Sequence, residues 1–210
     1  MRLNRTQWAS VIAVVLALLF AGGAVTVASA DRDDAPTTPT AESADAGFAR
    51  DMAVHHQQAV EMSFIVRDRT KDEDVRRLAY DIANTQANQR GMMLGWLDMW
   101  GLPKVQSGVA PMTWMGMGVY ADEEAGADGA LMPGMATRAQ LDQLRTASGR
   151  AAEVLYLKLM TAHHKGGIHM AQGCVEKCVP GVERDLAQGM VDAQESEIKL
   201  MADMLRARGA

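Results

Sequence analysis

The chain has few aromatic residues and no excess of positive charge. Aromatic side chains make up 5% of its 210 residues, and 26 acidic residues outnumber 21 basic ones, which gives a net charge of −5. Because an acidic protein offers no broad basic surface to a phosphate backbone, we do not expect nucleic acid as a partner. The chain has 16 methionines, whose flexible thioether side chains must fill much of the interior or act as ligands.

The sequence also lacks the local patterns of common catalytic sites. It contains no Glu-x-x-His, which is the spacing that oxidative di-metal centres in helical bundles use. A serine elbow, a phosphate-binding glycine loop and a Cys-x-x-Cys pair are missing too. We therefore expect a protein that is not an enzyme.

Cysteine is scarce, with Cys174 and Cys178 separated by one helical turn. In an oxidising exterior this spacing favours a local disulfide. The alternative is a second thiolate site that also uses Met170. Cys174 would lie about 15 Å along a helix from His164, so these two side chains would not bind the same ion.

The N-terminal segment has no charged residue between Trp8 and Ala30. It follows two arginines and ends in Ala28-Ser29-Ala30, whose small side chains suit a cleavage site, so the pattern predicts a secretory signal peptide at 1–30. An uncleaved membrane anchor is the alternative, because the apolar run is long enough to span a bilayer. In both cases we expect the folded part to be secreted or held in the cell envelope.

One stretch occurs twice, 108 positions apart. Each copy reads Met-x-x-His-His, then five residues, then Met. The first copy contains Met52, His55, His56 and Met62, and the second contains Met160, His163, His164 and Met170. The similarity continues at the same offset, from Gln86 to Gln194 and from Met93 to Met201. A repeat of this length predicts a helical hairpin that packs against its own copy.

The spacing of apolar residues predicts four long helices, at 48–66, 75–100, 150–177 and 182–208, and a short helix that ends near Ala147. Thr70 with Glu73, and Thr137 with Gln140, have the spacing of capping boxes. No window alternates apolar and polar residues, so we expect no strands. Two hairpins of long helices predict an all-α four-helix bundle.

The expected domain organisation follows from these elements. Pro36 and Pro39 lie among small polar and acidic residues, a composition that predicts a flexible tether. We expect a signal peptide or anchor at 1–30, the tether at 31–46 and one domain at 47–210, divided into repeat one (47–101), a long crossover rich in methionine and glycine (102–147) and repeat two (148–210).

The duplicated motif places its histidines and methionines on one side of each helix. At about 100° per residue, the members of the first copy fall within an arc of roughly 120°, and those of the second copy fall within the same arc. His169 falls on the opposite face, where we expect it to be solvated. The bundle would therefore bring imidazoles and thioethers from both repeats to its interior.

This cluster predicts a metal site, because buried imidazoles need partners. Thioether and imidazole ligands together favour Cu(I), while imidazole alone also accommodates Cu(II) or zinc. Packing without a metal is the competing interpretation, since methionine stripes usually form core and Gln86 and Gln194 face the same interior. Both interpretations stay open at this point.

The paired Met-x-x-His-His motifs and the following helices resemble the family called domain of unknown function 305, over about 48–208. The resemblance implies a ferritin-like fold of two helical-hairpin repeats, export from bacteria and, for some members, copper handling. It also implies that the four paired histidines and the four methionines beside them are the functional residues. His169, where an acid is common, and the two cysteines depart from the family pattern.

The function that we expect is binding of copper between two hairpins, for sequestration or transfer to an envelope protein partner. A metal-free envelope bundle that binds a peptide or another helix is the alternative. The first function needs the histidines of both repeats to lie close together in the interior.

Overall fold

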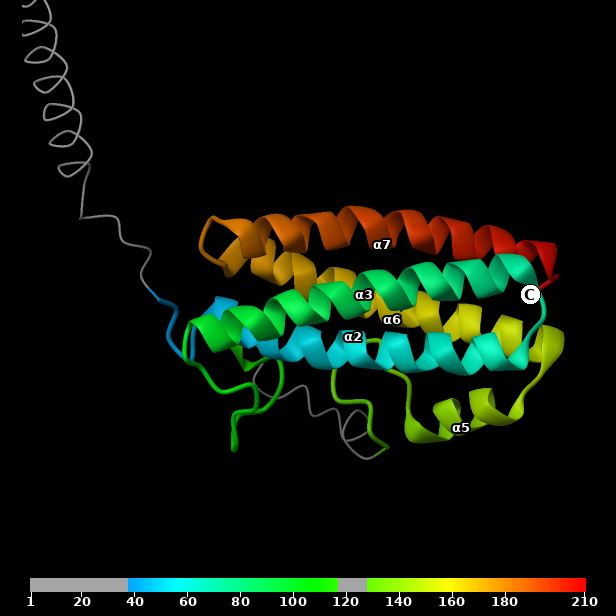
Figure 1. Ribbon diagram of the computed structural model, residues 1–210, viewed down its shortest axis with the longest axis horizontal. Coiled ribbons are helices and arrows are strands. Elements are labelled where there is room, and N and C mark those ends of the chain that lie inside the picture. Colours follow the sequence, from blue (N-terminus) through cyan, green and yellow to red (C-terminus); the bar gives the residue numbers. More distant parts are fainter. Residues whose placement is uncertain (1–37, 117–127) are drawn as a thin grey trace, which may run out of the picture. The chain divides into compact units, whose positions relative to one another are not determined.

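The computed structural model describes residues 38–116 and 128–210. These residues form five α-helices and one short 3-10 helix, and they contain no strand (Figure 1). The elements are α2 (Ala44–Arg69), α3 (Glu73–Met99), η2 (Thr113–Met115), α5 (Arg138–Thr146), α6 (Gly149–Lys177) and α7 (Val182–Ala207). The predicted signal segment 1–30 and residues 31–37 of the predicted tether lie outside the described residues. None of the described helices is both long enough and apolar enough to cross a bilayer.

The N-terminal ends of α2 and α3 differ from the sequence expectation. α2 begins at Ala44, several residues before the predicted start, because the Ser43 hydroxyl accepts a hydrogen bond from the backbone N–H of Ala46 (3.2 Å). The predicted Thr70–Glu73 capping box is wrong. Asp72 caps α3 instead by accepting from the N–H of Val75 (3.0 Å). The Thr70 hydroxyl donates to Oε1 of Glu153, on α6 (2.5 Å).

The predicted capping box at the start of α5 is confirmed. The Thr137 hydroxyl accepts from the N–H of Gln140 (3.2 Å), and the Gln140 side chain accepts from the N–H of Thr137 (2.8 Å). Leu141 and Leu144 are buried in the core. α5 therefore packs the end of the crossover against α2 and α6.

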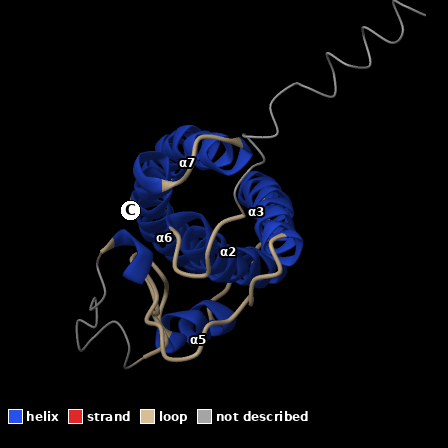
Figure 2. Ribbon diagram, turned by 90° about the vertical axis from the view of Figure 1, so that its left-hand side faces the viewer, coloured by secondary structure: helices blue, strands red, loops and turns tan. Residues whose placement is uncertain are grey.

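The long helices pair as two hairpins, α2 with α3 and α6 with α7, and α2 also packs against α6. Contacts between α2 and α6 run in opposite directions along the two helices, since His55 meets His163 and Ser63 meets Tyr156. α2 and α6 are therefore antiparallel. The view along the helices places α2 beside α6, with α5 on one side of this pair and α3 and α7 on the other (Figure 2).

The buried apolar residues form two clusters along the length of the helices. One contains Met52, Met170 and Met190, and the other contains Met62 and Met160. The four histidines of the repeated motif belong to neither cluster, although they are buried. They form a polar layer between the two apolar clusters. Each cluster contains one methionine of the repeated motif from each repeat.

Candidate metal centre

The four paired histidines are all in the interior. His55 and His56 come from α2, His163 and His164 come from α6, and none is more than 1% exposed. The four methionines of the motif, Met52, Met62, Met160 and Met170, are 0% exposed. His169, the remaining histidine, is exposed, as its position on the opposite face of the helix predicts.

His55 and His163 are the central pair of this layer. Their ring centroids are 3.7 Å apart, with planes inclined by 32°. Nε2 of His163 lies 2.9 Å from the backbone oxygen of His55, and Nε2 of His55 lies 3.2 Å from the backbone oxygen of Pro133. Because a carbonyl oxygen only accepts, both Nε2 atoms must carry the proton.

His56 and His164 lie beside the central pair and make equivalent contacts with the second helix of their own hairpins. Nε2 of His56 is 2.8 Å from Oε1 of Gln89, and Nε2 of His164 is 2.6 Å from Oε2 of Glu197. Both partners stand 33 positions after their histidine, so the duplication extends to the hydrogen bonds. One repeat therefore uses a neutral amide, whereas the other uses a carboxylate.

Each of the four histidines keeps an unused ring nitrogen. Every Nδ1 atom is buried and has no hydrogen-bond partner among the residues that the structure describes. With the proton on Nε2, Nδ1 carries the lone pair that binds a metal ion. A metal-binding histidine commonly donates its other N–H to a carbonyl or carboxylate, which fixes the ring and its tautomer. These four rings have that arrangement.

The metal-free interpretation offered two glutamines as partners for the imidazoles, but neither is hydrogen-bonded to one of the four rings. Gln86 and Gln194 are buried, but their Oε1 atoms have no partner among residues 38–116 and 128–210. The partners of His56 and His164 are instead Gln89 and Glu197, one helical turn further along. Gln86, Gln89, Gln194 and Glu197 line a narrow cleft of about 10 Å³ between α3 and α7.

The histidines do not form a site of three or more imidazoles by themselves. Within the described parts of the chain, no three of them place ring nitrogens within 4.8 Å of one another. An ion bound to this arrangement would take at most two imidazoles and would need other ligands. The thioethers of the adjoining methionines are the soft groups at hand.

Burial keeps the rings of His55, His56 and His163 neutral. Removal from water lowers the pKa of His55 from 6.5 to about 4 and that of His56 to about 3, and the neighbouring histidines contribute in the same direction. Burial likewise lowers the pKa of His163 well below its ordinary value. Protons therefore do not compete for the ring nitrogens of these three histidines at neutral pH.

The crossover is held against the histidine layer by close backbone contact with α6. A β-carbon on Gly166 would lie 1.8 Å from the oxygen of Pro133, so glycine is required for this approach. The Gln58 side chain, at the equivalent position of α2, donates to the oxygen of Ala136 (2.9 Å) and accepts from its N–H (2.6 Å). These contacts hold the Pro133 carbonyl at the position where it accepts from His55.

Replacing Gly166 by alanine is expected to lower the free energy of unfolding by about 1–3 kcal/mol, because the added methyl group displaces the Pro133 backbone. Gly189→Ala is the matched control, since a β-carbon there meets no atom within 4 Å. That control is expected to stabilise α7 by about 0.5–1 kcal/mol. Urea unfolding of the two variants measures the difference, and equal effects would contradict the close approach.

Cys174 and Cys178 form a disulfide at the end of α6, with their Cα atoms 4.8 Å apart. Both cysteines are buried in the apolar cluster that contains Met170. Neither cysteine belongs to the histidine layer. The bond therefore ties the last turn of α6 to the residue that follows the helix.

Comparison with solved structures places the chain among known relatives. A DUF305 protein of Streptomyces coelicolor, described as a candidate secreted protein, is 68% identical, with a TM-score of 0.74 over 81% of this chain and 97% of that one. A DUF305 fragment from Deinococcus radiodurans is 30% identical, with a TM-score of 0.63 over 78% of this chain and 96% of that one.

A more distant likeness is CopM in its Cu(I)-bound form, which is 20% identical, with a TM-score of 0.57 over 78% of this chain and 96% of that one. At this identity the likeness establishes the fold alone. No protein with a curated description matches the chain. The model of the domain of unknown function DUF305 matches residues 45–205, and the chain therefore belongs to the DUF305 family.

Proposed function

We propose that this protein binds copper in the exterior of the cell, between two pseudo-symmetric hairpins, and either stores the ion or passes it to a partner. The ligands are Nδ1 atoms of the paired histidines and the thioether sulfurs of the neighbouring methionines. The observation that carries the proposal is the set of four buried Nδ1 atoms without partners in the described residues.

The unused nitrogens favour a metal over plain packing for an energetic reason. A buried polar atom without a hydrogen bond costs about 1–3 kcal/mol, so four of them in one layer are a large penalty for a metal-free core. The opposite nitrogen of each ring is already hydrogen-bonded, so the rings are oriented before an ion arrives. A bound ion would offset this penalty for the Nδ1 atoms, at most two, that it takes as ligands.

Copper is the metal that fits the donor set best. Because at most two imidazoles can contribute without rearrangement, the remaining ligands are thioethers, which select Cu(I) among the first-row metals. Cu(II) or zinc binding would instead draw on the imidazoles. The relative CopM has structures in Cu(I)-bound, Cu(II)-bound and Ag-bound forms, which agrees with a soft-metal site in this fold.

The proposal also covers the origin of the fold and the cellular location of the protein. We infer a ferritin-like bundle that arose by duplication of one hairpin, with residues 1–30 acting as a signal peptide or anchor. We also propose that the protein is not an enzyme.

Gln89 and Glu197 line the cleft between α3 and α7, which offers a route for the ion toward His56 and His164.

Replacing thioethers without changing the packing tests the choice of metal. Met52→Leu combined with Met160→Leu removes two sulfurs, one from each repeat, at a cost in stability of less than about 1.5 kcal/mol per site. The expected result is at least about tenfold weaker Cu(I) binding, with Cu(II) binding much less affected. Competition with a chromophoric chelator under anaerobic conditions measures both affinities.

The exposed Met99 provides a control for this experiment. Met99→Leu is expected to leave Cu(I) affinity unchanged. If the double variant also binds Cu(I) as the unaltered protein does, Met52 and Met160 are not ligands, and the pair Met62→Leu with Met170→Leu must weaken binding for any thioether to be one.

A second candidate function is that of a metal-free interaction module. A pocket of about 290 Å³ beside the start of α2, lined in part by Val54, Val105, Val109 and Trp114, is the observation that favours it. The motif methionines are buried and do not line this pocket. A melting temperature that does not rise with added Cu(I) would favour this function, because a ligand that binds only the native state must stabilise it.

A further inference from the structure

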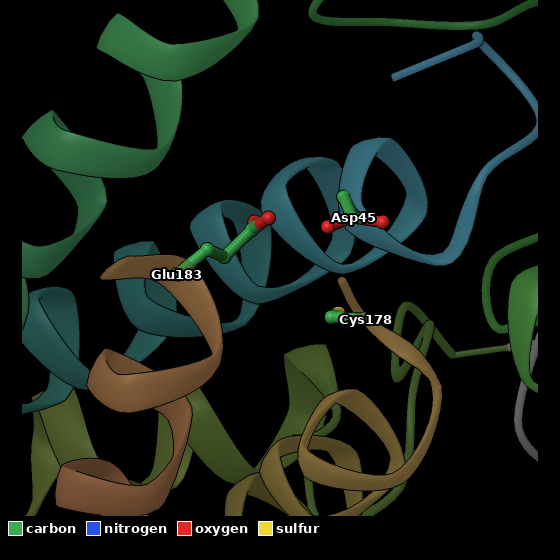
Figure 3. Close-up of side chains that lie close together, drawn as sticks. All are labelled: Asp45, Cys178 and Glu183. Carbon is green, nitrogen blue, oxygen red and sulfur yellow. The ribbon is translucent and has the colours of Figure 1, made fainter. Parts of the chain in front are cut away.

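A second cluster of possible ligands lies where the end of α6 meets the starts of α2 and α7. Asp45, Cys178 and Glu183 each place one possible ligand atom within 4.8 Å of the others (Figure 3). The three residues are only 4–6% exposed. They come from three separate elements, since Asp45 is in the first turn of α2, Cys178 follows the end of α6 and Glu183 is in the first turn of α7.

Glu183 has no visible reason to be buried. Both of its carboxylate oxygens are inaccessible and have no hydrogen-bond partner among the described residues. Asp45, the nearest acid, accepts from the N–H of Val179 (3.1 Å) but offers Glu183 only a like charge when both are ionised. Burial and Asp45 accordingly raise the pKa of Glu183 to about 9. A cation placed between the two acids would remove both problems.

Cys178 supplies the third ligand only when its disulfide is open. The sulfur that binds metal is the thiolate, and in the closed state this sulfur is bonded to Cys174. A dithiol reductant would exchange its two S–H bonds for the protein disulfide and leave two protein thiols. The Cys178 thiol could then lose its proton to become a ligand. The disulfide therefore controls whether the cluster has two ligands or three.

We propose that Asp45, Cys178 and Glu183 form a second metal site, for a divalent cation of the zinc and cadmium class, that is closed by the Cys174–Cys178 disulfide and opens on reduction. One thiolate and two carboxylates match the ligand types that zinc accepts, with room for a further ligand. The N-termini of α2 and α7 carry partial positive charge, which offsets part of the repulsion among three anionic ligands. This site is independent of the histidine layer.

Two cysteine variants separate the roles of the disulfide and of the thiol. Cys174→Ser removes the disulfide and leaves Cys178 as a free thiol without any reductant, whereas Cys178→Ser removes the disulfide and the proposed ligand together. Titration with Cd²⁺ reports on the site directly, because a cadmium–thiolate bond has its own ultraviolet charge-transfer absorption. Imidazole ligands in the histidine layer give no such band.

The expected result is a saturable thiolate band, with one equivalent of Cd²⁺, for Cys174→Ser and none for Cys178→Ser or for the oxidised protein. Glu183→Gln added to Cys174→Ser should weaken the Cd²⁺ affinity by at least about tenfold. If Cys174→Ser does not fold, the unaltered protein, reduced by a dithiol and then freed of it by gel filtration without oxygen, replaces it. No band, or a band that Glu183→Gln leaves unchanged, would overturn the proposal and leave Glu183 as a carboxyl group that holds only a proton.

Discussion

Replacing His55 and His163 together by alanine is expected to lower the affinity for Cu(I) by at least about 100-fold, more than loss of an outer-shell partner costs. These two rings are in contact, come from the two repeats and have unused Nδ1 atoms. Removing both deletes a pair of imidazoles whose rings are in contact across the two hairpins. Anaerobic competition against a Cu(I) chelator measures the change.

Two comparisons guard against an effect of misfolding. His169→Ala removes an exposed histidine of the same helix and should leave Cu(I) affinity unchanged. His55→Gln with His163→Gln keeps a polar side chain in each place and should also lose the metal while retaining helical content by circular dichroism. Retention of Cu(I) by the folded glutamine variant would contradict the proposed site.

The metal-free protein is expected to lose stability steeply as the pH falls below about 6.5. The pKa of an unfolded histidine is near 6.5, whereas in the folded protein it is about 4 for His55 and about 3 for His56. In this interval the unfolded chain binds protons that the folded chain does not, so acid favours unfolding. The loss is complete only below the folded pKa values and is on the order of 3 kcal/mol for His55 alone.

Glu183 changes the free energy of unfolding with pH in the opposite direction over part of this range. The pKa of Glu183 rises from 4.5 to about 9 on folding, so its contribution to the stability of the folded state is lost as the pH rises through that interval. Because three histidines oppose one carboxyl group, the net slope below pH 6.5 should follow the histidines. Urea unfolding from pH 7 to pH 5 measures it.

Single substitutions show which histidines cause the loss of stability at low pH. His56→Gln should flatten the fall in stability between pH 7 and pH 5, whereas His169→Gln should leave it unchanged. A wild-type stability that is constant over this range would mean that the rings of His55, His56 and His163 are not buried as neutral groups. Bound Cu(I) should reduce the fall, since an occupied Nδ1 cannot take a proton.

Much of the fold can be predicted from the repeat. For residues 38–116 and 128–210, the five α-helices, the absence of strands and the pairing of consecutive long helices as hairpins follow from the 3.6-residue periodicity and the internal duplication. The helix ends are less predictable, because competing polar residues can take the same role. Thr70 has the spacing of a capping residue, but its hydroxyl bonds to Glu153, 83 positions away, and Asp72 caps the helix.

The contacts of the candidate site are only partly visible in the sequence. The arc of the motif indicates which side chains face inward, but not which partners they meet. Gln89 and Glu197 could have been identified by their identical offset from His56 and His164. The Pro133 carbonyl could not have been identified, because every residue has a backbone oxygen and the sequence does not indicate which one contacts His55. Its approach depends on tertiary packing at Gly166.

X-ray absorption at the copper edge of the Cu(I)-loaded protein tests the central claim most directly, since it identifies the atoms bound to the ion. The account predicts a mixed shell of imidazole nitrogen and thioether sulfur, with the imidazole signal lost in the His55→Gln and His163→Gln double variant. A shell without imidazole, or one that this variant leaves unaltered, would contradict it.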